Sequence, residues 1–263
     1  QELWSTAPEG IEMHFGRASR VINVIGSEQI YPQKVLKAVL KLMGREREAE
    51  NSVHLSYEHA ALPEGAFSGR EGSWVGYTAD DVIEETKKEA MKQIRERFKD
   101  MKDEEKERIA NAVAIGAIRF DFLRMRPEKK IIFKWEEALR FDGDTAPYIQ
   151  YSHARAARIL EKAGKSSGEI EFSAISSPDE KRLVKRLASF PSVVESSAGE
   201  NSPHAVADYL LDLSNAFSKF YQNCPVTQAE GDVRVARLGL VSCYKEVVKS
   251  GLWLLGIEAP ERM

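Results

Sequence analysis

One predicted helix, which follows Pro147, carries the side chains best suited to binding chemistry. At 100° per residue, a sector about 80° wide contains Tyr148, Tyr151, Arg155, Arg158 and Lys162. Aromatic rings stack on unpaired bases, and arginine and lysine neutralise phosphates. This face therefore suits single-stranded RNA in a loop. The alternative is that the tyrosines border a protein core and the cations form an ordinary solvated surface.

Three further features could contact phosphates or small ligands. Residues 119–134 form a locally basic stripe that contains Arg119, Arg124, Arg126, Lys129, Lys130 and Lys134. The loop Ser68-Gly69-Arg70-Glu71-Gly72 offers bare backbone amides beside one cation, although the sequence has no P-loop pattern. Gln29 follows a predicted strand, where α/β sheets bind ligands. Each feature is also typical of an ordinary helix end, loop or surface position.

The elements that must position these residues change in type along the chain. Residues 19–25 alternate into an apolar run, and residues 32–43 show helical periodicity, which together predict a strand, a turn and a helix. Residues 52–57 predict a second strand, so this region indicates part of a parallel α/β layer.

The rest of the sequence predicts helices almost throughout. Thr78 and Asp81 suit a capping box at the start of a long helical stretch. The predicted helices span residues 79–125 (one or two helices), 148–164, 179–190, 203–223 and 234–255. A mainly α fold follows, with an all-α bundle in the second half.

Composition excludes several classes of protein. The 263 residues are 43% hydrophobic and 30% charged, with a net charge of −3, which excludes general disorder and a uniformly basic nucleic-acid binder. No apolar run approaches the roughly 20 residues that cross a membrane, so we expect no membrane partner. Two cysteines and the lack of an HExxH pattern predict no structural metal and a reducing, cytoplasmic setting. Because Gln1 opens the sequence, we expect a longer parent protein.

Four segments, in this order, resemble arginyl-tRNA synthetases. They read VIGSEQIYPQKVLKAVLKLMG (24–44), WEEALRFDGDTAPYIQYSHARAARIL (135–160), FYQNCPV (220–226) and ARLGLVSCYKEVVKSGLWLLGIEAPERM (236–263). The resemblance implies a class I synthetase that uses ATP and Mg²⁺ to attach arginine to tRNA(Arg).

The resemblance also implies a division of the chain. Residues 1–88 would be a partial Rossmann-type α/β remnant of the catalytic domain, residues 89–143 connecting helices, and residues 144–263 an all-α anticodon-binding bundle of the DALR type. In this arrangement the chain would supply anticodon recognition and one wall of the ATP site.

The same resemblance assigns roles to individual residues. Tyr148, Tyr151 and Arg155 match a family helix that lies against the anticodon loop, with Arg158 and Lys162 on the same face. Met263 matches a terminal residue that helps to form the pocket for an anticodon base. Gln29 matches a glutamine near bound arginine.

The glycine loop occupies the place of the KMSKS signature, so Ser68, Gly69 and Arg70 are the candidates for binding ATP. Ala66 and Phe67 stand where lysine and methionine are usual, which leaves Arg70 as the nearby cation that could act in catalysis.

The other class I signature, HIGH, is not present in the sequence. We therefore expect this chain alone neither to activate arginine nor to charge tRNA, and arginine and ATP to bind only with the missing amino-terminal half. Two alternatives stay open: a non-catalytic tRNA-binding module derived from the same family, and a helical protein-interaction module without an RNA role.

Overall fold

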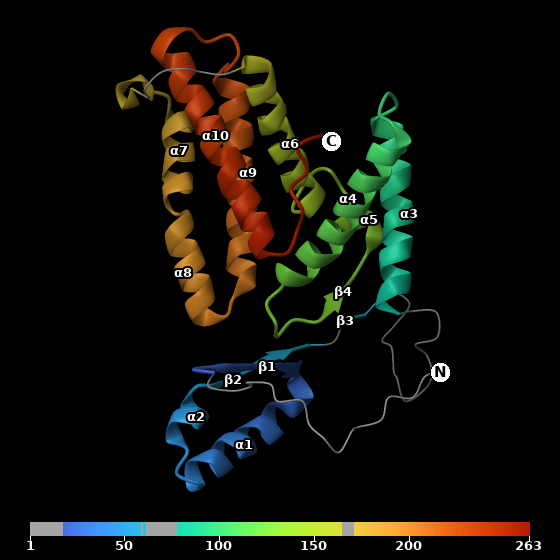
Figure 1. Cartoon of the computed structure of the whole chain (residues 1–263), viewed down its shortest axis with the longest axis vertical. Helices are drawn as coiled ribbons and strands as arrows, with labels where there is room; N and C mark the ends of the chain where they lie inside the picture. The colour runs from blue at the N-terminus through green and yellow to red at the C-terminus, as the bar shows by residue number, and fades with distance from the viewer. Residues whose placement is uncertain (1–17, 59, 62–77, 165–170) are drawn as a thin grey trace, which may run out of the picture. The chain divides into compact units, whose positions relative to one another are not determined.

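The computed structural model of the protein describes residues 18–58, 60–61, 78–164 and 171–263. The chain divides into two compact units, one ending at Tyr57 and the other beginning at Glu58. Figure 1 shows the first unit in blue and the second from cyan to red. The mainly α fold with a small parallel α/β region, expected from the sequence, is confirmed.

The first unit is a strand–helix–strand arrangement. Strands β1 (Val21–Gly26) and β2 (Ser52–Tyr57) pair in parallel, with Val21 opposite Ser52 and Gly26 opposite Tyr57. The chain between them forms η1 (Ser27–Gln29), α1 (Ile30–Leu42) and α2 (Glu46–Glu50). The strand, turn and helix predicted from periodicity are confirmed, because each pattern is local and matches the period of its element.

In its described residues, the second unit is helical apart from one short strand pair, β3 (Ala60–Ala61) with β4 (Ile131–Ile132). Its helices are α3 (Ala79–Arg97), α4 (Asp103–Leu123), α5 (Trp135–Ala138), α6 (Ala146–Ala163), η2 (Phe172–Ala174), α7 (Pro178–Ala188), α8 (Phe190–Glu200), α9 (Pro203–Asn223) and α10 (Gly231–Leu254). The capping box at α3 is confirmed: the Thr78 hydroxyl accepts from the Asp81 N–H at 3.2 Å, and the Asp81 carboxylate accepts from the Thr78 N–H at 2.7 Å.

Two hydrophobic cores lie within the helical unit. The larger joins α6, α7, α9 and α10, where the rings of Phe217 and Tyr244 stack at 3.8 Å between centroids. The smaller joins α3, α4 and residues 133–141. Helix α6 contributes to both, since Ile149 belongs to the larger core and Tyr151 packs against the smaller one. This double packing fixes the orientation of α6.

Three of the described α-helices, α2, α5 and α8, were not predicted from the sequence. A single helix was expected over 179–190, whereas α7 ends at Ala188 and α8 begins at Phe190. Pro191 lies in the first turn of α8, where a missing N–H costs nothing, so this proline suits the start of a new helix. The predicted boundary at residue 88 lies inside α3. The division of the chain into residues 1–88, 89–143 and 144–263 stays a prediction. None of the described helices is both long and apolar enough to cross a membrane.

Candidate nucleic-acid interface

Helix α6 begins at a well-defined cap. The Thr145 hydroxyl accepts a hydrogen bond from the N–H of Tyr148 at 3.3 Å and donates one to the carbonyl oxygen of Arg140 at 2.6 Å. Pro147 occupies the first turn, which suits its fixed φ. The cap therefore fixes where the face with Tyr148, Tyr151 and Arg155 begins.

The Arg155 guanidinium lies between two aromatic rings. Its central carbon is 5.0 Å from the ring centroid of Tyr151 and 5.3 Å from that of Tyr221, which comes from α9. Both distances lie within the range of cation–π attraction. Tyr151 in turn meets Phe141 edge to face, with centroids 6.4 Å apart. Arg155 and Tyr151 are both partly exposed, so the group presents a charge and aromatic surface without being sealed from solvent.

Tyr148 is held differently. Its hydroxyl donates to the Asn215 side-chain oxygen at 3.0 Å, and its ring packs against the edge of the larger core. Burial raises the pKa of Tyr148, against weaker opposing effects of Ser218 and Arg155. Tyr148 therefore packs at the edge of the larger core and stays partly exposed.

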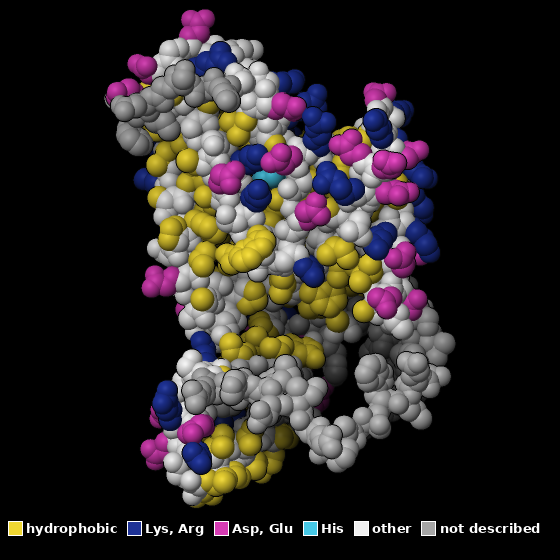
Figure 2. All heavy atoms as spheres, viewed as in Figure 1, with side chains coloured by type: hydrophobic (Ala, Val, Ile, Leu, Met, Phe, Trp, Pro, Cys, Tyr) yellow, Lys and Arg dark blue, Asp and Glu magenta, His cyan; other side chains and the backbone are white. Residues whose placement is uncertain are grey.

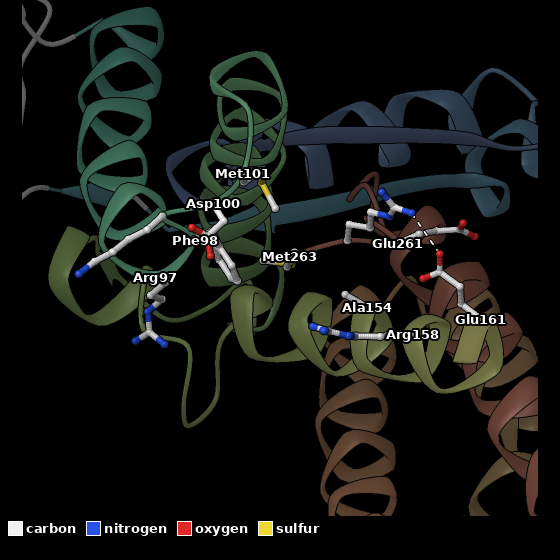
Figure 3. Close-up of a pocket in the computed structure, with 11 residues that line it drawn as sticks. Arg97, Phe98, Asp100, Met101, Ala154, Arg158, Glu161, Glu261 and Met263 are labelled. Atoms are coloured by element: carbon white, nitrogen blue, oxygen red, sulfur yellow. Dashed lines mark hydrogen bonds and ion pairs between the residues drawn. The ribbon is translucent and has the colours of Figure 1, made fainter. Parts of the chain in front are cut away.

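A pocket of about 430 Å³ lies beside this face (Figure 3). Phe98 and Met101 line it from the segment between α3 and α4, while Ala154 and Arg158 line it from α6. Figure 3 shows Met263 between these two groups. Arg158 is exposed, and so is Lys162 one turn further along α6. Apolar side chains line the pocket together with charged side chains of both signs.

Ion pairs leave the pocket with an excess of cations. Of its acidic lining residues, Glu161 pairs with Arg262 at 3.1 Å and Glu261 pairs with Lys245 at 2.7 Å. The hydrogen bond and charge of Lys245 lower the pKa of Glu261, so this carboxylate stays ionised and paired. Arg97, Lys99 and Arg158 also line the pocket, with Asp100 as the remaining acid.

The other predicted site residues lie in the first unit, outside the described residues, or in the basic stripe. Gln29 ends η1 in the first unit and is exposed. Ser68, Gly69 and Arg70 lie outside the described residues. Within the basic stripe 119–134, Arg119 donates to the carbonyl oxygen of Gly256 and Arg124 to that of Asp144, so these two cations make internal hydrogen bonds.

The sequence analysis missed Tyr221 and Phe98 as members of the site. Tyr221 lies within the segment FYQNCPV, but a helical wheel of one helix cannot show which side chains a neighbouring helix brings to it. Phe98 precedes a turn far from α6 in sequence, and no local pattern marked it. The described residues contain no group of three or more side chains placed to hold a metal ion.

Family models match both parts of the chain. Residues 149–263 match the DALR anticodon binding domain, and residues 11–135 match the catalytic domain of class I tRNA synthetases (R). Arginine–tRNA ligases from Thermococcus kodakarensis and Pyrococcus abyssi are 47% and 48% identical over all of this chain, which covers 42% and 43% of their lengths.

A solved structure agrees with these relatives. The arginyl-tRNA synthetase of Thermus thermophilus is 39% identical, with a TM-score of 0.89, over 98% of this chain and 43% of that protein. The chain thus spans about two fifths of the length of the relatives it matches. Its partial α/β layer, its helical bundle and these matches agree, and over its whole length the chain resembles part of an arginyl-tRNA synthetase.

Proposed function

We propose that the helical unit recognises the anticodon loop of tRNA(Arg) as part of an arginine–tRNA ligase. The reaction is arginine, ATP and tRNA to arginyl-tRNA, AMP and pyrophosphate. The observation that carries the proposal is the placement of Arg155 near the rings of Tyr151 and Tyr221, on the helix that also lines the pocket of Met263.

Each part of this surface has a role in the proposed binding. A base turned out of the loop would enter the pocket and contact Phe98 and Met263, or stack on the exposed part of the Tyr151 ring. Arg158 and Lys162, both exposed, would meet phosphates along the same strand. Arg155 would add positive charge while the rings of Tyr151 and Tyr221 hold its guanidinium in place. Binding of this kind weakens with salt, because phosphate contacts release counterions.

The ATP-dependent half of the reaction is proposed from the family alone. Gln29 would hydrogen-bond arginine, and Ser68, Gly69 and Arg70 would contact ATP, which reacts with Mg²⁺ bound. Since the loop lies outside the described residues, no geometry of this chain supports a particular step. The 263 residues contain no HIGH signature, and we expect this chain alone to show no arginine- and tRNA-dependent ATP–pyrophosphate exchange. We also propose that the protein acts in the cytoplasm.

Substitution of Tyr151 tests the proposal. Loss of one base–aromatic contact costs about 1–3 kcal/mol, so Tyr151→Ala should weaken binding of an anticodon stem-loop of tRNA(Arg) by roughly 5- to 150-fold. Fluorescence anisotropy at two salt concentrations measures both the affinity and its salt dependence. Far-UV circular dichroism checks that the variant remains helical.

Trp253→Ala is the matched control, because Trp253 is an aromatic residue on α10 that is 75% exposed and does not line the pocket. It should bind the stem-loop as the unchanged chain does. Equal affinity of Tyr151→Ala and the unchanged chain would contradict the role of Tyr151. Failure of the unchanged chain to bind the stem-loop at low salt would favour a protein-interaction module.

A further inference from the structure

Residues 256–263, which follow α10, form a carboxyl-terminal tail held through alternate carbonyl groups. The oxygen of Gly256 accepts from the Arg119 guanidinium. The oxygen of Glu258 accepts from the Gln150 amide at 2.8 Å, and that of Pro260 lies 2.9 Å from Nδ1 of His153. Alternate residues of an extended chain point in the same direction, so side chains of α4 and α6 bind the tail much as a neighbouring strand would.

Gln150 joins three segments. Its side chain is fully buried, and its amide nitrogen also donates to the carbonyl oxygen of Ala112 on α4 at 3.1 Å. A Cβ atom at Gly116 would lie 2.9 Å from this nitrogen and 3.1 Å from Ile257, so glycine leaves room for the amide between α4 and the tail. The link that Gln150 makes between α4 and the tail therefore depends on the space left by Gly116 as well as on hydrogen bonds.

His153 makes a directional bond from a buried position. A carbonyl oxygen can only accept, so Nδ1 of His153 carries the proton, and Nε2 is buried without a hydrogen-bond partner. Burial lowers the pKa of His153, with Lys245, Lys249 and Glu261 as the charged groups around it. The ring therefore stays neutral and serves as a fixed donor to the tail.

We propose that Gln150 and His153 are positioning residues that hold the tail so that Met263 stays in the pocket beside Arg158. Their two bonds end three residues before Met263, and the pairs Lys245–Glu261 and Arg262–Glu161 fix the residues between. The effect on RNA recognition rests on the proposed function, whereas the position of Met263 does not. The pattern of one helix thus combines RNA-facing side chains with side chains that complete the neighbouring pocket.

Methyl NMR of the whole chain, with ¹³C-labelled methionine, tests the position of Met263 without RNA. The chain has six methionines, and those remote from the tail are internal controls. In His153→Ala and Gln150→Leu, the Met263 methyl signal should move to the position of an unfolded peptide. In His153→Asn, whose amide can donate from nearly the same place as Nδ1, the signal should stay near its original position. An unmoved Met263 signal in both His153→Ala and Gln150→Leu would overturn the proposal.

Affinity for the anticodon stem-loop tests the consequence for recognition. Met263→Ala and His153→Ala should weaken binding to the same extent within about twofold, and the double variant should bind no more weakly, because both changes remove one interaction. Fully additive losses would overturn the link between the tail and RNA. If the unchanged chain does not bind the stem-loop, the proposed function fails, while the NMR result still decides whether Gln150 and His153 position the tail.

Discussion

The two units of the chain differ in how much of their apolar surface they bury. The helical unit contains two cores, with Leu210, Phe217 and Tyr244 fully buried. In the described part of the first unit, only Ala49 and Ser52 are buried. Figure 2 shows hydrophobic side chains on its surface over α1.

This difference shows that a sequence can form an amphipathic helix that adds little to the stability of the chain. The apolar periodicity of α1 is as clear as that of α9, yet Val39 and Leu42 on α1 are 44% and 87% exposed. Periodicity determines which face of a helix is apolar, whereas most of the stabilising free energy comes from burial of that face. We therefore expect the helical unit to hold nearly all of the stability of this chain.

The largest expected effect comes from substitution in the larger core. Phe217→Ala removes a fully buried ring that stacks on Tyr244 with an interplanar angle of 4°, so it should lower the free energy of unfolding by about 3–5 kcal/mol. Leu42→Ala, in the first unit, should change it by less than about 0.5 kcal/mol. Urea denaturation followed by circular dichroism measures both values. Losses of similar size would show that the first unit also contributes a cooperative core.

The next largest effect on the free energy of unfolding should come from a buried ion pair of the helical unit, compared with an exposed pair of the first unit. Glu180 is 1% exposed and pairs with Arg237 at 2.7 Å, whereas Arg45 and Glu48 in the first unit are both largely exposed. Burial alone would raise the pKa of Glu180, but hydrogen bonds from Arg237 and from the N–H groups of Ser177 and Ser176 outweigh it and lower the pKa.

Arg237→Met leaves this buried carboxylate without its cation and should cost about 3 kcal/mol in the same denaturation experiment. Arg45→Met should cost less than about 1 kcal/mol, because exposed pairs gain little from charge attraction. If both variants lose the same free energy of unfolding, burial does not determine how much each ion pair stabilises the chain.

Local features of the fold could be predicted from the sequence, and features that depend on distant partners could not. The capping box of Thr78 and the helix after Pro147 follow from spacings of a few residues. The second helix after Ser189 was missed, because Pro191 alone does not show whether a helix ends or begins.

The candidate site shows the same limit. Tyr151 and Arg155 were identified because they share one helical face, but Tyr221 reaches Arg155 from α9. His153 is buried on α6, and its bond to Pro260 joins residues 107 positions apart. Helical periodicity carries no information about such a partner.

The alkaline limit of stability should also distinguish the units. Burial raises the pKa of Tyr209 to about 12, and its hydroxyl donates to the carbonyl oxygen of Arg186 at 2.9 Å. In the unfolded chain this phenol loses its proton near its ordinary value of 10.0. The contribution of Tyr209 is therefore complete below pH 10 and is lost as pH rises toward 12.

The loss should reach about 2 kcal/mol, which urea denaturation between pH 9 and about 11.5 can follow. Tyr209→Phe should flatten this decrease. Tyr31→Phe, at a position in the first unit that is 75% exposed, should leave the decrease unchanged. An equal alkaline decrease in Tyr209→Phe would mean that other groups cause it.

The smallest expected effect lies on the acid side and depends on His153. Burial lowers the pKa of His153 below its ordinary value of 6.5, so the unfolded chain binds the proton more readily than the folded chain. Stability from this group is complete above pH 6.5 and is lost as pH falls from there through the lowered pKa. His153→Asn should remove this dependence while it keeps the bond to Pro260, and His54→Gln, in the first unit, should leave it intact. Lys245 and Lys249 place positive charge near the ring and also disfavour its protonation in the folded state.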